Sequence, residues 1–350
     1  MSLLRFLRLP KKGPYSFSRG VAEKGYGPLV ADDRATEDDV LYAYRLILKR
    51  DPDPGGLAHY RQLVADGLSL DRLIVSFVNS DEYRLRQTDE ARPTPVDLGG
   101  YHVCIQKLDT DFGQGIFHSH KYEEHVRQAA RDNLREGDVA VDVGANIGVL
   151  TFLAASIVGK PGRVIAVEPN PDNLQLLYRG IVHNGFTNVE VLPHAASNAR
   201  TVFSLTGGTS NTHLIGAREP EEGGHFVQSI VLDDALGDLP RLDFVKMDIE
   251  GHEPQALEGF SRLIGRHRPV LLVEFNPRCL VDLQRQDPLA FLKQIFAFYP
   301  RVRVTSAFED DETLDSAEKV MAYWEGRNRE ITARKLLPDR MLHFDLVTLK

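Results

Sequence analysis

Cysteine is scarce in this sequence. Only Cys104 and Cys279 occur among 350 residues, and they form no CxxC pair. A disulfide framework or a zinc-thiolate site needs more cysteines at closer spacing, so neither is predicted. This cysteine usage fits a reducing compartment, and we expect a cytoplasmic protein.

Long apolar runs and basic stripes are also missing. The longest uncharged run, residues 143–159, is shorter than the roughly 18 residues of a spanning helix, so no transmembrane segment is predicted. In the N-terminal segment, Arg5 and Arg8 interrupt the apolar run too early for a signal peptide, and we expect residues 1–35 to be a tail. The net charge of -8, without a basic stripe beyond that tail, argues against nucleic acid as a partner.

Residues 36–90 have the pattern of a small helical module. Thr36 and Asp39 stand at the spacing of a capping box ahead of an apolar helix face. The turn DPDPGG at residues 51–56 separates this helix from the next, and Ser80 is expected to cap a last short turn. The two acids of the turn lack EF-hand spacing, so we favour helix capping over a calcium loop.

The module also resembles a known domain. Its segment YRLILKRDPDPGGLAHYRQLVADGLSLDRLIVSFVNSDEY is similar to a helical domain of unknown function from bacterial surface-layer and glycan-assembly proteins, with Tyr60 where that family usually has tryptophan. The resemblance implies a docking module, with a protein or a glycan as the partner of residues 36–87.

The pattern changes after residues 91–100, ARPTPVDLGG, which are rich in proline and glycine and are predicted to be a linker. Within residues 101–350 the apolar runs DVAVDVG, RVIAVEP, VEVLPHAA, SIVLDD, LDFVKMD and PVLLVEF alternate with helical stretches. Parallel strands that are buried on both faces produce such runs. We therefore predict a doubly wound α/β domain, preceded by the small all-α domain.

The stretch VDVGANIGVLTFLAA, residues 141–155, predicts a strand, a turn and a helix. Asp142 lies at the end of the strand, Gly144 permits a sharp turn, and Gly148 would let the helix N-terminus approach a ligand. A pyrophosphate-binding GxGxxG turn would have its middle glycine where Asn146 stands. The turn therefore suits an uncharged or cationic group better than a pyrophosphate.

The next strand ends at Glu168, about 20 residues after Gly148, where an acid can accept hydrogen bonds from both hydroxyls of a ribose. An adenosine-containing ligand is thus predicted. A nucleotide-dependent oxidoreductase is an alternative on the same sheet, although the missing middle glycine disfavours it. A non-catalytic scaffold in glycan assembly is another.

Five segments carry a second resemblance: VAVDVGANIGVLTFLAA, GRVIAVEPNPDNLQLL, NVEVLPHAASN, LDFVKMDIEGHEPQALEG and RHRPVLLVEF. In this order they look like the FkbM-type S-adenosylmethionine-dependent methyltransferases, over about residues 122–275. The resemblance implies S-adenosylmethionine as cofactor and a class I methyltransferase (Rossmann-like) sheet of seven strands with the last antiparallel. It also implies methyl transfer mainly to oxygen.

The resemblance further implies which residues contact the cofactor. The methionine part would border Asp142, Gly144, Asn146 and Gly148; Glu168 would bind the ribose with Asn170 beside it; and the Ala195/Ala196 turn would flank the adenine. For Asn170 turn formation is an equal alternative, and for the two alanines strand-end packing is.

An alcohol acceptor needs its proton removed during methyl transfer. The strand LDFVKMDI is followed by clustered acids and a histidine, and the next strand, PVLLVEF, carries another acid near its end. The candidate catalytic residues are Asp248, Glu250, His252 and Glu274. Lys246 is unusual in a buried strand, and we expect it to pair with one of these acids, in the chemistry or only in a network that fixes the loop.

Three further features leave alternatives open. Carboxylates with one histidine would suit magnesium or manganese, but no metal is predicted because the only closely spaced histidines, His118 and His120, lie in a loop. Tyr122, with Glu123, either faces the cofactor's sulfonium or carboxylate end or packs in the core. The polar insertion at residues 205–216, including Ser210 and Asn211, either covers the acceptor or is a surface hairpin.

Taken together, these patterns predict an O-methyltransferase that uses S-adenosylmethionine. We expect a small-molecule or glycan acceptor, methylated at a hydroxyl of a sugar or glycan intermediate.

Overall fold

The computed structural model describes residues 34–48, 50–86, 92–107, 109, 112–207, 212–216, 225–306, 311–334 and 342–349. It divides into two compact units, residues 1–87 and 88–350. The expected N-terminal tail up to residue 33, and the expected polar pair Ser210 and Asn211, lie outside the described residues.

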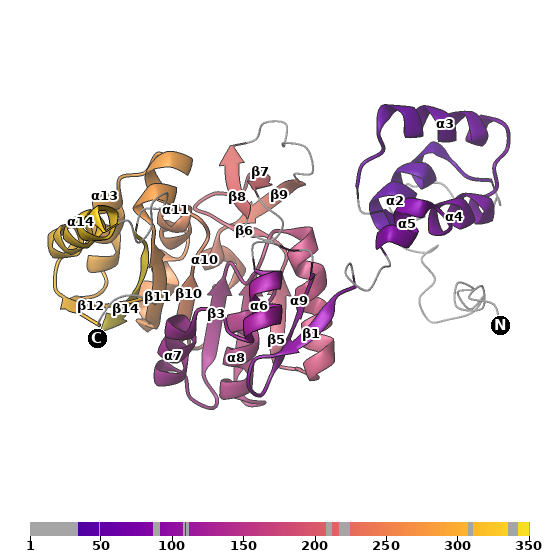
Figure 1. Ribbon diagram of the computed structural model, residues 1–350. Coiled ribbons are helices and arrows are strands. Elements are labelled where there is room, and N and C mark those ends of the chain that lie inside the picture. Colours follow the sequence, from indigo (N-terminus) through magenta and orange to yellow (C-terminus); the bar gives the residue numbers. More distant parts are fainter. Residues whose placement is uncertain are drawn as a thin grey trace. The chain divides into compact units, whose positions relative to one another are not determined.

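In its described part, the first unit consists of helices α2 (Glu37–Ile47), α3 (Pro54–Ala65), α4 (Leu70–Val78) and α5 (Asp81–Arg86) (Figure 1). The capping box that the sequence predicts is present: the Asp39 amide donates to Thr36 Oγ1 at 3.2 Å, and the Thr36 amide donates to Asp39 Oδ2 at 2.8 Å. The Tyr83 amide donates to Ser80 Oγ at 3.1 Å, so the predicted cap of α5 is also confirmed.

A small core holds these helices together. Val40, Tyr44, Leu73 and Phe77 are buried, and the rings of Tyr44 and Phe77 meet edge to face with centroids 4.8 Å apart. Aromatic pairs in this geometry stabilise a core beyond the area that they bury. The second acid of the DPDPGG turn, Asp53, caps α3 as predicted. Its carboxylate accepts a hydrogen bond from the Gly56 amide at 2.8 Å.

The second unit begins with an antiparallel hairpin, β1 (Thr94–Asp97) and β2 (His102–Ile105). Residues 94–98, expected as part of a linker, are instead built into this unit: Val96 and Leu98 are buried in its core. The glycines that suggested a linker form the hairpin's turn, with positive φ at Gly99 and Gly100. The proline- and glycine-rich composition therefore correctly predicted a turn, but the turn belongs to a hairpin of the second unit and not to a linker.

Among the described residues, the main sheet has eight strands. Five of them, from β11 through β10, β3 and β4 to β5, are parallel neighbours, and β14 runs antiparallel to both β11 and β12. The predicted doubly wound sheet with an antiparallel last strand is thus present, and the two-residue β13 adds one strand to the expected seven. In spatial order the strands are β13 (Thr313–Leu314), β12 (Arg301–Thr305), β14 (Phe344–Leu349), β11 (Val270–Phe275), β10 (Phe244–Met247), β3 (Val139–Val143), β4 (Arg163–Val167) and β5 (Val189–Leu192).

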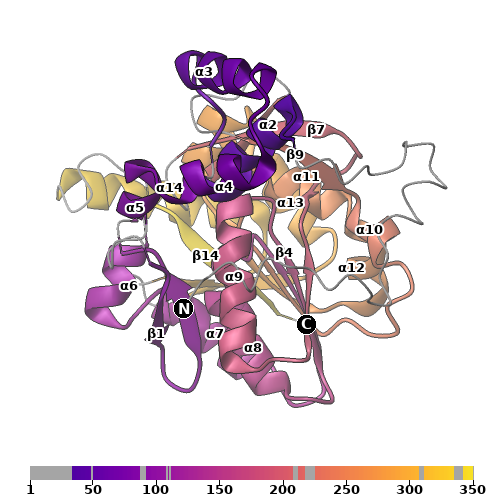
Figure 2. The same cartoon turned by 90° about the vertical axis from the view of Figure 1, so that its right-hand side faces the viewer.

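Helices cover both faces of the sheet, as Figure 2 shows for α6 to α9 on one side and α10 to α13 on the other. Alternate strand residues therefore enter different cores: Val141 and Val143 pack in one, and Ala140 in the other. No helix in the described part of the chain combines the length and apolarity needed to cross a membrane. One layer is α6 (Gly113–Ser119), α7 (Glu124–Asn133), α8 (Val149–Val158) and α9 (Pro171–Asn184); the other is α10 (Leu232–Ala235), α11 (Glu253–Glu258), α12 (Ser261–His267), α13 (Pro288–Phe296) and α14 (Ala317–Ala333).

A second, four-stranded sheet has the order β6 (Ala195–Ala196), β9 (His225–Ile230), β7 (Val202–Gly207) and β8 (Thr212–Gly216). It overturns one expectation. The run SIVLDD was predicted to be a strand of the doubly wound sheet, but its first residues belong to β9 in this small sheet and its last ones to α10. A short apolar run cannot by itself distinguish these settings.

Candidate active site

Charged side chains gather on one face of the main sheet, at the carboxyl ends of its strands. On β3, Asp142 lies on the same face as buried Ala140, and the register places it opposite Lys246 of β10. On β11, Glu274 lies opposite Asp345 of β14. Strand alternation and register together therefore bring four charged residues, distant in sequence, to one edge of the sheet.

This edge opens into a cavity of about 550 Å³. Eleven of the fourteen predicted site residues line it, and three do not. Three residues of the polar insertion, Leu205, Thr212 and Leu214, also line it, from the antiparallel pair β7 and β8. The predicted residues in the lining are Tyr122, Asp142, Gly144, Asn146, Glu168, Ala195, Ala196, Lys246, Asp248, Glu250 and Glu274; those outside it are Gly148, Asn170 and His252.

The turn after β3 packs tightly against the loop after β10. Gly144 has φ +81°, and a Cβ at this position would lie 2.0 Å from the carbonyl oxygen of Asp248. The carbonyl oxygen of Gly144 in turn accepts a hydrogen bond from Lys246 Nζ at 3.0 Å. Glycine is therefore required here by both conformation and space.

Gly148 has a different role from the predicted one. It precedes α8 with φ +95°, and a Cβ would come within 2.6 Å of side-chain atoms of Leu177 and Phe152. It does not line the cavity. This glycine allows close packing at the start of α8, and the preceding residues of the turn line the cavity instead.

Glu168 is held in place by the backbone around it. Its carboxylate accepts hydrogen bonds from the amides of Asn146 at 2.7 Å and Asn170 at 2.8 Å. Burial raises the pKa of Glu168 to about 7, against the opposing effect of these amides. The Asn170 side chain caps α9 by accepting from the Asp172 amide, so its turn-forming alternative is the one observed. Asn170 thus positions Glu168 without reaching the cavity.

Lys246 joins the two halves of the site. Its Nζ lies 3.2 Å from Asp248 Oδ2 and 3.9 Å from Asp142 Oδ1, so the predicted pairing with an acid is present. Burial alone would lower the pKa of Lys246, but the neighbouring carboxylates Asp248 and Asp142 raise it above its usual value. Thr151 Oγ1 donates to Asp142 Oδ2 at 2.6 Å. The lysine is therefore a charged bridge between β3 and β10.

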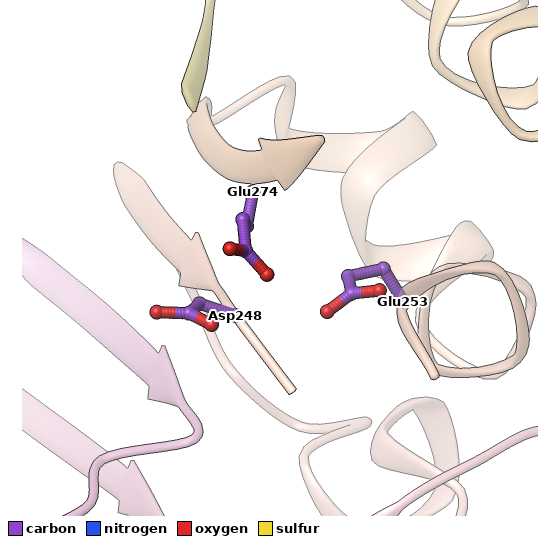
Figure 3. A group of neighbouring side chains, drawn as sticks. All are labelled: Asp248, Glu253 and Glu274. Atoms are coloured by element: carbon purple, nitrogen blue, oxygen red, sulfur yellow. The ribbon is translucent and has the colours of Figure 1, made fainter. Parts of the chain in front are cut away.

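Three carboxyl groups lie near one another where β10 and β11 end and α11 begins: those of Asp248, Glu274 and Glu253 (Figure 3). One oxygen from each lies within 4.8 Å of the others, a grouping that could hold a divalent cation. Glu253 Oε1 accepts from the amides of Ile249 and Gly251 at 2.7 and 3.2 Å. Burial raises the pKa of Glu253 to about 8, and burial with the nearby charge of Asp248 raises that of Glu274 well above its usual range.

His252 is separated from this cluster. It is 3 % exposed, its Nε2 lies 3.0 Å from Ser197 Oγ, and its Nδ1 lies 3.3 Å from Gln284 Oε1. Burial lowers its pKa below the usual value, which favours the neutral imidazole. The histidine joins the loop after β10 to β6 and to the segment after β11, and it does not face the cavity as the sequence suggested.

Several lining residues did not enter the predicted site. Glu123, considered only as a neighbour of Tyr122, adopts φ +40° just before α7, and burial and the charge of Asp248 raise its pKa to about 8. Cys279, which follows β11, donates from Sγ to Glu250 Oε2 at 3.3 Å. Cys279 follows the end of β11 by a few residues, as Glu250 follows the end of β10. This position just after a parallel strand was the sequence signal that could have identified it.

A buried pair beside the cavity was also missed. His125 Nε2 lies 2.9 Å from Asp345 Oδ2, and Asp345 is only 8 % exposed. Burial lowers the pKa of His125, but the hydrogen bond to Asp345 outweighs it and raises the value. An acid in the otherwise apolar strand FDLVTL is the same signal that identified Glu274, and it could have identified Asp345.

Two segments of the chain match known domain families. Residues 142–287 match the family model described as the Methyltransferase FkbM domain. Residues 29–86 match the domain of unknown function DUF4214, so both resemblances predicted from the sequence are confirmed.

The curated relatives match only parts of this chain. The hexuronic acid methyltransferase AglP of Haloferax volcanii is 29% identical over 146 residues, 41% of this chain and 58% of that protein. A protein-L-isoaspartate O-methyltransferase of Methanococcus aeolicus is 32% identical over 98 residues, 28% of this chain and 44% of that protein. The crystal structure of a methyltransferase FkbM from Methylobacillus flagellatus is 20% identical, with 85% of this chain and 65% of that one covered and a TM-score of 0.36. The chain thus spans about half the length of these two curated relatives.

Proposed function

We propose that this protein is an S-adenosylmethionine-dependent O-methyltransferase that methylates a hydroxyl of a sugar or glycan intermediate. The observation that carries the proposal is the cavity at the strand ends, which joins the Asp142–Asn146 turn and Glu168 to the carboxylates beyond β10 and β11. The FkbM match to residues 142–287 supports methyl transfer, and the partial similarity to a hexuronic acid methyltransferase supports a sugar acceptor.

The residues present fit the cofactor. Asp142 Oδ1 and Asn146 Oδ1 are buried and accept no hydrogen bond from any described residue, which is unusual for buried polar atoms and suits a ligand with several donors. Glu168, held by two backbone amides, would accept hydrogen bonds from the ribose hydroxyls. Ala195 and Ala196 would pack against the adenine, as their small side chains leave room for a ring. S-adenosylmethionine, when bound, supplies a methyl group activated by a sulfonium.

The chain's own contribution is to position the acceptor and take up its proton. As the acceptor oxygen takes the methyl group that the bound cofactor would supply, with the sulfur leaving as a neutral sulfide, the hydroxyl proton would pass to a carboxylate. We assign that carboxylate to Asp248, which lines the cavity and is fixed by Lys246 at 3.2 Å. Such positioned proton transfer accelerates reactions by about 10² to 10⁴. Glu250 and Glu274 would bind neighbouring hydroxyls of the acceptor.

The test has a binding arm and a transfer arm. Isothermal titration calorimetry of the full chain with S-adenosylhomocysteine and with NAD should show binding of the first alone. The double variant Asp142→Ala/Glu168→Ala should lose it. Methyl-labelled S-adenosylmethionine is then incubated with neutral and acidic sugars, and label at a sugar oxygen is expected. NAD binding instead of S-adenosylhomocysteine would overturn the proposal in favour of an oxidoreductase.

For the helical unit we propose a docking role toward a protein or glycan partner. Tyr42 of α2 is 59% exposed and Val75 of α4 is 44% exposed, which leaves apolar side chains available for contact. The full chain and its Tyr42→Ser/Val75→Ser variant are each used as bait in a pull-down, and the partners that they recover are compared. Equal recovery of partners by the two proteins would contradict the docking role.

A further inference from the structure

The lining of the cavity is strongly unbalanced in charge. Seven carboxylic acids line it but only three lysines or arginines, among the residues that the structure describes. Such an imbalance in a partly enclosed site repels anions and attracts cations. The acids are Glu123, Asp142, Glu168, Asp248, Glu250, Glu274 and Asp282, and the cations are Arg127, Lys246 and Arg278.

The three cations are already engaged within the protein. Arg127 donates to Glu124 Oε2 at 2.6 Å and to the carbonyl oxygen of Leu98. Arg278 lies 3.7 Å from Asp282, and its side chain is 53% exposed. Lys246 is the one that reaches the interior of the site, where it lies between two carboxylates. Lys246 therefore cannot neutralise both of these carboxylates, and an excess of negative charge remains beside it.

The excess of acid lies at one end of the cavity, which we call the acidic end: Glu123, Asp248, Glu250 and Glu274. The acidic end is contiguous with the turn after β3, since Gly144 packs directly against the Asp248 backbone. A cofactor that extends from Glu168 to this turn therefore has its reacting end beside these acids. Burial and the charges of neighbouring acids raise the pKa of Glu274 well above its usual range and that of Glu123 to about 8, so these two hold their protons at neutral pH. The negative charge of the acidic end therefore comes from its other two acids, which would attract a positive charge placed there.

We propose that the acidic end selects the cationic cofactor over its product, so that S-adenosylmethionine binds more tightly than S-adenosylhomocysteine. The inference rests on the proposed function. The two ligands share the adenosine and the amino-acid part and differ by the methyl group and the positive charge on sulfur. Once the methyl group has been transferred, the attraction to the acidic end is lost. The site thereby favours product release and limits inhibition by the product.

Calorimetric titration of the full chain tests this selection without knowledge of the acceptor. The ligands are S-adenosylmethionine, S-adenosylhomocysteine and sinefungin, which carries an amine in place of the sulfonium methyl; EDTA is present to keep divalent cations out of the cluster. We expect the two cationic ligands to bind about tenfold more tightly than S-adenosylhomocysteine. Glu250→Gln should reduce this ratio severalfold and leave the Kd of S-adenosylhomocysteine unchanged. Glu274→Gln replaces a carboxyl group that holds its proton at neutral pH, so it should change the ratio little. Glu318→Gln, at an exposed position of α14, is the matched control and should not alter the ratio.

The possible outcomes separate cleanly. Equal affinities for the three ligands, or tighter binding of S-adenosylhomocysteine, would overturn the selection while leaving the proposed function intact. An equal loss for all ligands in Glu250→Gln would mean that this acid only maintains the shape of the site, which also overturns it. Binding of none of the three by the wild-type protein would contradict the proposed function itself.

Discussion

The two units of this protein use acidic residues in opposite ways. In the helical unit the acids stay near water and serve the backbone: Asp39 closes the capping box of α2, and Asp53 caps α3. The Gly56 amide lowers the pKa of Asp53. In the α/β unit Glu168 and Glu253 are 4 % and 1 % exposed, and burial raises their pKa to about 7 and about 8.

This difference separates structural from functional acids without any knowledge of the reaction. A carboxylate whose pKa is lowered stabilises the fold in its charged form, whereas one whose pKa is raised destabilises the fold when it ionises. Proteins retain the second kind where a ligand or a reaction needs it. The strand-end acids of the α/β unit are therefore the ones that a bound group is expected to compensate.

The largest effect is expected from removing the cation between those acids. Lys246→Met would leave buried Asp142 and partly exposed Asp248 without their counter-charge, which should cost about 3–5 kcal/mol of unfolding free energy. Arg61→Met in the helical unit is the matched control, because Arg61 and Glu37 are 54% and 59% exposed and such a pair contributes about 0–1 kcal/mol. Denaturant titrations of both variants measure their free energies of unfolding. Equal losses of stability would contradict the difference proposed between the charges of the two units.

The next effect concerns the turn that carries the cofactor site. Gly144→Ala would place a Cβ 2.0 Å from the Asp248 carbonyl oxygen at φ +81°, and it should destabilise the protein by about 3 kcal/mol and abolish S-adenosylhomocysteine binding. Gly185→Ala is the control, since Gly185 has φ +68° but open space around it, so only the conformational cost of about 1 kcal/mol remains. Thermal melts and calorimetry distinguish the two. If both variants lost the same stability and kept the same affinity for S-adenosylhomocysteine, the predicted clash at Gly144 would be contradicted.

Sequence patterns predicted the fold well where the signal is local. The apolar runs identified β3, β4, β10 and β11, and residues directly at their ends, such as Asp142 and Glu168, were found because the carboxyl ends of parallel strands meet at one edge. Local patterns could not predict the register in which strands pair or the direction in which a loop turns. Asp345 joins the site only because β14 pairs with β11 in one register, and His252 leaves it because its loop turns toward Ser197.

A smaller effect links pH to the buried acids. In the folded protein Glu253 keeps its proton up to a pH of about 8, but in the unfolded chain it releases the proton near 4.5. Between these values the folded state binds more protons, so rising pH removes stability. Glu253→Gln should therefore gain stability relative to the wild type between pH 5 and pH 8, by on the order of 2 kcal/mol. Glu258→Gln, on the exposed side of α11, should show no such gain; a parallel pH profile for the two variants would contradict the assignment.

The smallest effect tests the other side of the comparison. Thr36→Ala removes the hydroxyl that accepts from the Asp39 amide, and loss of such a cap typically costs about 1 kcal/mol. Because a helix cap in an exposed position involves no buried charge, this loss should be the same at pH 6 and pH 8, unlike the effect at Glu253. Hydrogen exchange of the α2 amides measures it directly, with the α8 amides as the internal control. Faster exchange in α8, or a pH-dependent loss in α2, would mean that the acids of the helical unit are not the purely structural group described above.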